Sequence, residues 1–338
     1  MDSAGSVHVI SKELIKPSSP TPDHLKTVKL SVLDQLTPPV YISLIFFYEA
    51  DELKGLASST DQAQICHHLK QSLSKTLTSF YPLAGKIDPE SFTVCCDDYG
   101  VEFVEARARA PLRDVVHEAK LDEFHKGCRG GMRVAPSGRR VVSGGFHERM
   151  GSYLSGENPK TAPEFGVLGG YFPARDLSDS NFSPSLLMGN AKLVTKRLVF
   201  DKEKLAALKK AAATGDVRDP TRVKSKPPLE NTFGNGCFTA VAELSHQHRL
   251  PAPELHELVS KLRNAIRTID DEYIRDTERE DRYLSDLGRV CDLISEGEAD
   301  AFVFSSWCRF PMYEVDFGWG KPVWACTTAL LVSNLAIL

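Results

Sequence analysis

The 338-residue sequence predicts a mixed α/β fold, because strand-like and helix-like patterns alternate along the chain. Its length fits two domains of ordinary size better than one. Hydrophobic residues make up 42% of the chain and charged residues 25%, which is typical of a folded globular protein and argues against a disordered, collagen-like or coiled-coil chain. We therefore expect two domains, over residues 1–190 and 191–338.

Strands are predicted where β-branched and aromatic residues gather. Residues 41–48 read Tyr-Ile-Ser-Leu-Ile-Phe-Phe-Tyr, which favours a buried strand, and residues 29–36 favour another. Residues 92–106 predict a β-hairpin, because the turn-forming residues Asp97, Asp98 and Gly100 separate two strand-like runs. Further strands are predicted at residues 193–200, 301–307 and 323–331.

Three helices are predicted, the first and third from apolar residues spaced three or four positions apart. The first begins after the capping residues Ser59–Asp61 and ends before Pro82, which cannot continue a helix. The second spans residues 202–213, with Asp201 as its N-cap. The third, over residues 253–281, has the clearest amphipathic pattern in the chain.

Residues 117–170 differ from the rest of the chain. They hold eleven glycines, their apolar periodicity is weak, and arginines gather at positions 129, 133, 139 and 140. A stretch of this length without regular structure is unusual inside a domain. Two interpretations remain open: an inserted flexible loop, or a sequence that never evolved to fold in this place.

Charge and cysteine placement exclude several classes of function. Lys and Arg number 41 against 45 Asp and Glu, so no overall positive field would attract nucleic acid or an anionic membrane. The eight cysteines are scattered without a C-x-x-C pair, and we expect no metal. The N-terminus lacks the apolar core of a signal peptide, and the apolar run 323–338 is shorter than a membrane span. We therefore expect a cytoplasmic protein.

Other motifs indicate little chemistry by themselves. His246 and His248 could start a metal site, but no third ligand stands at a diagnostic spacing, and a polar loop is the better interpretation. The lysines of residues 202–210 fit a solvated helix face better than a phosphate-binding surface. The sequence contains no G-x-S-x-G run of a serine hydrolase.

The densest motif is Asp316, Phe317, Gly318, Trp319 and Gly320. The two glycines allow backbone angles that other residues avoid, on either side of the large indole of Trp319. The carboxylate of Asp316 lies in apolar surroundings and therefore needs a cationic or N–H partner. The residues themselves favour a structural turn that buries Trp319 over a catalytic role.

Several runs of residues, taken in order, resemble the plant BAHD acyltransferases. The most specific is Tyr313–Pro322, which reads Tyr-Glu-Val-Asp-Phe-Gly-Trp-Gly-Lys-Pro. Phe80–Lys86 resembles the family's Tyr-Pro-Leu-Ala-Gly-Arg segment, and residues 10–17 are similar to the vinorine synthase-like branch, whose members acylate alkaloid alcohols. Further similar runs are Val104–Arg107, Phe172–Leu177 and Pro228–Asn235.

The resemblance implies a two-domain, chloramphenicol acetyltransferase-like fold of mixed sheets flanked by helices. It also implies transfer of an acyl group from acyl-CoA, a co-substrate rather than a bound cofactor, to a hydroxyl or amine of a specialised metabolite. The family's general base is the histidine of a His-x-x-x-Asp motif, and its Asp-Phe-Gly-Trp-Gly loop is structural. The family is usually monomeric.

The chain departs from the family pattern at the base. None of its ten histidines is followed by Asp four places on. His147 lies in the expected interval and is the candidate catalytic residue, although Glu148 cannot replace the missing carboxylate. His117 is the other candidate, but Asp122 stands one position too far. Cofactor-binding residues are not assigned.

The resemblance also implies that the fold is incomplete in this chain. A helix and a strand that the family has before the run at Pro228 are missing, and family members continue through further strands after the Asp-Phe-Gly-Trp-Gly loop, whereas this chain stops at Leu338. We therefore expect exposed sheet edges and poor solubility. The alternative to an active transferase is a catalytically inactive relative, a pseudogene product or the product of a misassembled gene, with at most a binding role.

Overall fold

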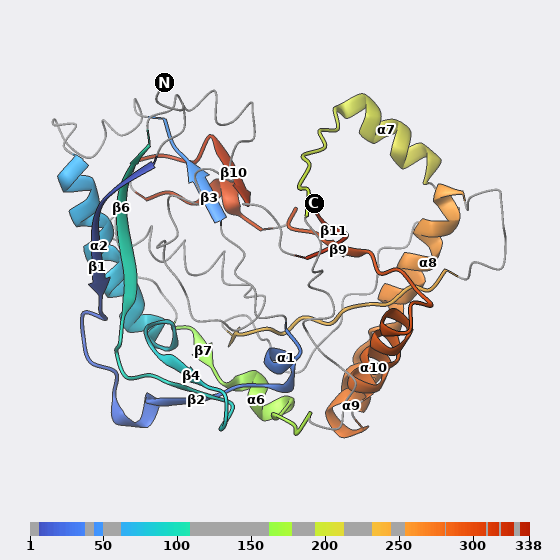
Figure 1. Ribbon diagram of the computed structural model, residues 1–338, viewed down its shortest axis with the longest axis horizontal. Helices are drawn as coiled ribbons and strands as arrows, with labels where there is room; N and C mark the ends of the chain where they lie inside the picture. Colours follow the sequence, from blue (N-terminus) through green and yellow to red (C-terminus); the bar gives the residue numbers. More distant parts are fainter. Residues whose placement is uncertain are drawn as a thin grey trace. The chain divides into compact units, whose positions relative to one another are not determined.

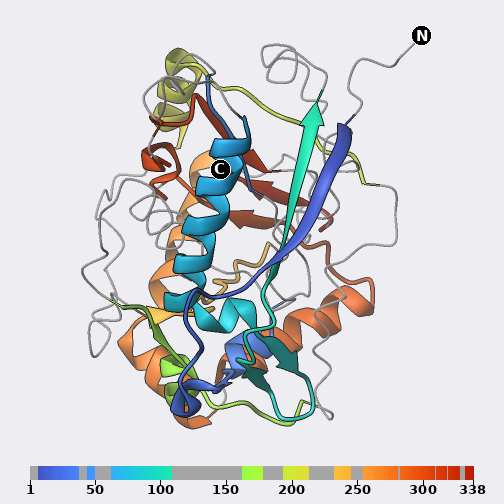
Figure 2. The same cartoon turned by 90° about the vertical axis from the view of Figure 1, so that its left-hand side faces the viewer.

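The chain divides into two compact units, which are described separately (Figures 1 and 2). The first consists of Met1–Thr195, Asn231–Asn235 and Cys291–Leu338, and the second of Lys196–Glu230 and Gly236–Val290. The computed structural model describes residues 7–37, 44–49, 62–108, 162–177, 193–212, 232–244, 254–280, 282–308, 310–317, 319–327 and 332–338. The sequence-based boundary at residue 190 stays a prediction.

The longest strand pair of the first unit joins β1 (Val7–Ile15) to β6 (Val101–Ala108) in antiparallel register. The register shifts by one residue between Val9 and Ser11. The pair runs beside α2 (Gln62–Ser79), as both views show (Figures 1 and 2). The predicted helix of this region is thus confirmed.

A second sheet of the first unit has the order β2-β5-β4, with all pairs antiparallel. Its strands are β2 (Thr27–Lys29), β4 (Lys86–Asp88) and β5 (Thr93–Cys95). The prediction of a hairpin over residues 92–106 is wrong, because β5 pairs with β2 and β4 whereas β6 pairs with β1. The predicted turn exists, with φ of +53° at Asp98 and +98° at Gly100, but it leads the chain into a different sheet.

The predicted strand over residues 29–36 is also wrong. Its second half forms the short helix α1 (Val32–Gln35). Ser31 caps this helix, and Ser31 and Asp34 form a reciprocal capping box. Two hydrogen bonds at the first turn outweigh the strand preference of the apolar residues.

Three smaller pairs complete the described strands of the first unit. β3 (Leu44–Phe47) pairs antiparallel with β10 (Trp324–Thr327), which confirms strands at both places. β9 (Val303–Ser305) pairs parallel with β11 (Leu335–Ile337). β7 (Glu164–Phe165) pairs parallel with β8 (Thr232–Phe233), and the helix α6 (Val167–Tyr171) follows β7.

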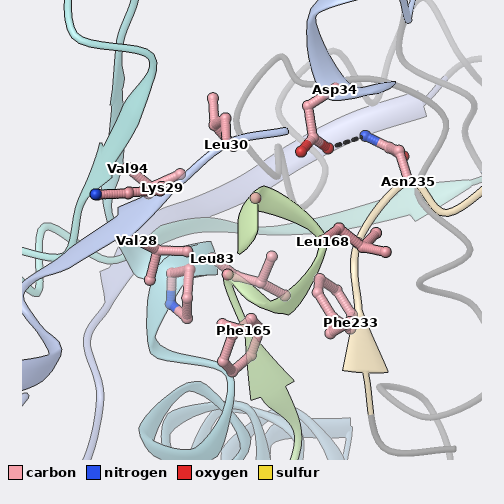
Figure 3. Close-up of a pocket in the computed structure, with 14 residues that line it drawn as sticks. Val28, Lys29, Leu30, Asp34, Leu83, Val94, Phe165, Leu168, Phe233 and Asn235 are labelled. Carbon is pink, nitrogen blue, oxygen red and sulfur yellow. Dashed lines mark hydrogen bonds between the residues drawn. The ribbon is translucent and has the colours of Figure 1, made fainter. Parts of the chain in front are cut away.

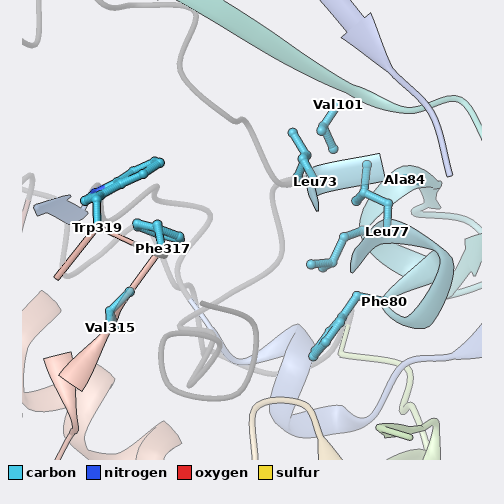
Figure 4. Packing of buried hydrophobic residues seen from close by; sticks show 9 residues of the cluster. Leu73, Leu77, Phe80, Ala84, Val101, Val315, Phe317 and Trp319 are labelled. Carbon is cyan, nitrogen blue, oxygen red and sulfur yellow. The ribbon is translucent and has the colours of Figure 1, made fainter. Parts of the chain in front are cut away.

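The core of the first unit combines residues from distant parts of the sequence (Figure 4). Leu73 and Leu77 of α2 are at most 1% exposed, and Phe80 is 2% exposed. Val315 and Trp319 belong to the same buried cluster, although more than 230 residues separate them from Phe80. The C-terminal motif therefore contributes to the core that α2 covers.

The second unit contains α7 (Lys202–Ala211), α8 (Leu255–Thr268), α9 (Asp271–Glu280) and the larger part of α10 (Arg282–Ser295). α7 confirms its prediction, since the Asp201 side chain accepts a hydrogen bond from the backbone N–H of Lys204 at 2.7 Å. The predicted strand at residues 193–200 is wrong: this segment has no regular structure, and Val194, Leu198 and Val199 are more than 70% exposed.

The single long helix predicted over residues 253–281 is two helices. The break falls between α8 and α9, where the Asp270 carboxylate accepts hydrogen bonds from the backbone N–H groups of Glu272 and Tyr273. An aspartate cap thus starts a new helix inside a continuous apolar pattern. No helix in the described part of the chain is long and apolar enough to cross a bilayer.

Cys96 provides a test of burial in the first unit. Its thiol is 1% exposed, and burial raises its pKa to about 12, with a smaller effect from the neighbouring Cys95. We expect native protein with the exposed Cys95 replaced by serine to leave Cys96 unmodified by iodoacetamide at pH 8.5, as read by peptide mass spectrometry. Modification of Cys96 in the folded protein would contradict its burial.

The folded state holds the proton of the Cys96 thiol more tightly than the unfolded state does. The contribution of Cys96 to the free energy of unfolding should therefore fall as pH rises from about 9 to about 12.

Candidate binding site around Asp34

α1 holds its acidic residue by an unusually complete set of hydrogen bonds. Oδ2 of Asp34 accepts hydrogen bonds from the backbone N–H of Ser31 at 2.8 Å and from its hydroxyl at 2.7 Å. Oδ1 accepts a hydrogen bond from Nδ2 of Asn235 at 2.6 Å. Ser31 is fully buried and Asn235 is 3% exposed, so this network lies within the fold.

Asp34 thereby ties together two segments that lie 201 positions apart in the sequence. Asn235 lies two residues after the end of β8 and ends the run Pro228–Asn235 that resembles the acyltransferase family. Residues 228–231 of that run lie outside the described residues.

The same helix also holds residues 172–175. The Gln35 side chain donates to the backbone carbonyl of Arg175 and accepts from its N–H, both at 2.9 Å. The backbone N–H of Val32 donates to the carbonyl of Phe172 at 2.9 Å. The run Phe172–Leu177, another of the family-like segments, is therefore fixed to α1 through backbone positions.

Asp34 and Asn235 border a small cavity, which we call the Asp34 cavity (Figure 3). Its volume is about 50 Å³, or about 480 Å³ when the open space at its mouth is counted. Its wall combines polar residues with an apolar majority: Val28, Lys29, Leu30, Asp34, Pro82, Leu83, Val94, Phe165, Gly166, Leu168, Gly169, Phe233, Gly234 and Asn235.

The cavity can bind a small molecule but lacks the groups for acyl transfer by itself. Its titratable side chains among the described residues are Asp34 and Lys29, and none of the described residues in its wall is a nucleophile or a histidine. Its volume of about 50 Å³ is also far below the ~300–1,000 Å³ of sites for drug-sized ligands. The Asp34 cavity is therefore a candidate site for a small ligand or a structural feature of the first unit.

The C-terminal motif forms a turn that is closed by its acidic residue. Oδ1 of Asp316 accepts a hydrogen bond from the backbone N–H of Gly320 at 2.9 Å, and Gly320 has a φ of +99°, which favours glycine. The carboxylate thus has the N–H partner expected from its apolar surroundings. Gly318 lies outside the described residues.

Aromatic side chains from β3 and the residues after it surround this turn. The Tyr48 hydroxyl donates to the carbonyl of Val315 at 3.0 Å, and its ring meets those of Phe317 and Trp319 edge to face. Burial, and then the charge of Asp316, raise the pKa of Tyr48 above its ordinary value. These contacts are those of a packed core, and the structural role expected for residues 316–320 stays a prediction.

The catalytic candidate His147 lies outside the described residues, as do His117, His246 and His248. The lysines of α7 are exposed. Sequence reasoning missed Asp34, Gln35 and Asn235. The Ser-x-x-Asp spacing of a capping box at Ser31 could have identified α1, but no local signal could have paired Asp34 with Asn235.

The Asp34 network predicts a measurable loss of stability. Asp34→Ala removes the acceptor for three hydrogen bonds and leaves buried donors of Ser31 and Asn235 without partners, so we expect the free energy of unfolding to fall by about 2–3 kcal/mol. Urea denaturation followed by circular dichroism measures this. The control is Asp88→Ala, which removes hydrogen bonds only within one turn and should cost less. Equal losses would contradict a special role for the network.

A protein-family comparison matches this chain to the "Transferase family" over residues 5–126 and 221–334. Vinorine synthase of Rauvolfia serpentina is 33% identical, over 99% of this chain and 91% of its own. Stemmadenine O-acetyltransferase of Catharanthus roseus is 31% identical, with the same coverage. A limonoid 1-O-acetyltransferase of Citrus sinensis is 30% identical, over 98% of this chain and 90% of its own.

The fold has a counterpart among solved structures. The crystal structure of vinorine synthase superposes with a TM-score of 0.73 at 30% identity, covering 98% of this chain and 91% of that one. The mixed α/β prediction is therefore confirmed at the level of fold class. The segments matched by the family comparison contain the motifs at Phe80–Lys86 and Tyr313–Pro322. The chain therefore belongs to the BAHD acyltransferase family.

Proposed function

We propose that this protein transfers an acyl group from an acyl-CoA thioester to a hydroxyl group of a specialised metabolite. The observation that carries the proposal is similarity over nearly the whole chain to relatives named as O-acetyltransferases. The names of these relatives include alkaloids and limonoids, so an alkaloid alcohol is among the acceptor candidates, and an amine is the other acceptor class. The protein acts as a cytoplasmic monomer without a bound cofactor.

In this proposal, His147 is the general base. It takes the proton from the acceptor hydroxyl while the oxygen attacks the thioester carbonyl carbon. The tetrahedral intermediate then collapses, the carbon–sulfur bond breaks, and the CoA thiolate receives a proton. Nearby hydrogen-bond donors must stabilise the negative oxygen of that intermediate.

The alternative, an inactive relative with at most a binding role, also has a supporting observation. The family match leaves residues 127–220 unmatched, and that interval contains His147. The alignment with vinorine synthase spans 392 positions, more than the 338 residues of the chain, so part of the relative stands opposite gaps.

One assay separates the two possibilities. Purified protein is mixed with acetyl-CoA and a panel of alcohols and amines, and thiol release is followed with a chromogenic reagent. Product formation supports the transferase, whereas folded protein without turnover supports the inactive relative. Reading the transcript in all three frames through residues 117–170 is an independent check, since a His-x-x-x-Asp in another frame would reveal a frame error.

A further inference from the structure

The polar end of the Asp34 cavity offers hydrogen-bond acceptors that lack donors. Oδ2 of Asp34 already accepts two hydrogen bonds from Ser31, but among the described residues Oδ1 accepts only the one from Asn235. A carboxylate oxygen can accept two, so one position on Oδ1 remains. Oδ1 of Asn235 is buried and accepts no hydrogen bond. A buried acceptor without a donor is costly, so this end of the cavity favours a ligand that donates hydrogen bonds.

The charge at this end is also uncompensated. The donors to Asp34 are a backbone N–H, a hydroxyl and an amide, all neutral, and in the part of the chain that the structure describes no cation pairs with its carboxylate. Lys29 lines the cavity, but its ammonium group extends away from Asp34 (Figure 3). A partly buried carboxylate is stabilised by a nearby positive charge. An ammonium ion, which brings both charge and donors, therefore fits this end better than water or a neutral alcohol.

The remaining wall sets the size and polarity of the ligand's other end. Leu83, Phe165, Leu168 and Phe233 contribute apolar surface. The volume of about 50 Å³ is several times the ~10–15 Å³ that one water molecule needs. That is room for a short alkyl chain.

We propose that the Asp34 cavity binds a small primary alkylammonium ion, with its charged group at Asp34 and Asn235 and its alkyl chain against Leu83 and Leu168. This binding site is independent of the acyl transfer proposed above. It requires neither acyl-CoA nor His147, and it is tested without measuring activity.

The first test is a titration of the full chain with propylammonium chloride. Methyl groups of leucine and valine are labelled with carbon-13, and their NMR shifts are followed at constant ionic strength. We expect propylammonium to cause saturable shifts at the methyl groups of Leu83 and Leu168. We expect 1-propanol to bind at least about tenfold more weakly, because hydrogen bonds to charged groups are stronger than those between neutral groups. Equal binding of the two probes, or no saturable shift with propylammonium, would overturn the proposal.

Variants then assign the site. Asp34→Asn removes the charge, and we expect binding of propylammonium to weaken about tenfold or more. Val28→Phe fills the cavity from β2 without touching the hydrogen bonds of Asp34, so it tests the site even if Asp34→Asn does not fold. The matched control is Lys12→Ala, which removes an exposed lysine of β1 that is not part of the cavity wall and should leave binding unchanged. Unchanged binding in folded Val28→Phe would place the ligand elsewhere.

Discussion

Phe80→Ala should reduce the free energy of unfolding of the first unit by about 3–5 kcal/mol, the usual cost of removing a fully packed aromatic ring. Phe80 is 2% exposed, and its ring meets that of Phe233 at a centroid distance of 5.3 Å and that of Phe165 at 6.1 Å. The substitution therefore leaves a void among α2, β7 and β8. Urea denaturation followed by near-ultraviolet circular dichroism measures the loss.

The matched control is Phe302→Ala in the same unit. Phe302 is 67% exposed, so the identical chemical change removes little packing, and we expect a loss below about 0.5 kcal/mol. Similar midpoints for the two variants would show that the buried cluster around Phe80 is not packed as the structure has it.

His147→Ala should lower turnover by about 10²–10⁴-fold if the protein transfers acyl groups with His147 as its general base. Without a base, the acceptor hydroxyl keeps its proton and attacks the thioester carbon poorly. The measurement is the initial rate of thiol release at saturating acetyl-CoA. Turnover should also fall as pH is lowered, because a protonated imidazole cannot accept a proton.

Two histidine variants serve as controls for this experiment. His117→Ala removes the other candidate base, and His256→Ala removes an exposed histidine of α8. We expect turnover of both to equal that of the unsubstituted protein. Full activity of His147→Ala, or a loss confined to His117→Ala, would refute the assignment of His147.

Local signals in the sequence predicted the elements that depend on local hydrogen bonds and on amphipathic spacing. The cap at Asp201 correctly placed α7, and apolar spacing correctly placed α2. The errors came from competition between signals. The capping box at Ser31 converted an apolar, strand-like run into α1, and the cap at Asp270 divided one amphipathic pattern into α8 and α9.

Partners distant in the sequence could not be predicted in this way. The turn at Asp98 and Gly100 was visible, but the choice of β1 as the partner of β6 depends on residues about 90 positions away. The candidate site has the same limit. Resemblance to a family identified the runs ending at Leu177 and Asn235, but their convergence on α1 depends on side-chain hydrogen bonds that no spacing encodes.

The pairing of β3 with β10 has a consequence for biosynthesis. Leu44 and Thr327 are paired in this ladder. β3 is synthesised early and can pair with β10 only after nearly all of the remaining chain has been made. During translation at about 5–20 residues per second, Tyr48 and the apolar face of α2 stay without Trp319 for about 12 seconds or longer. Long-range closure of this kind slows folding and leaves nascent apolar surface uncovered. Chaperone capacity and growth temperature should therefore affect the yield of soluble protein.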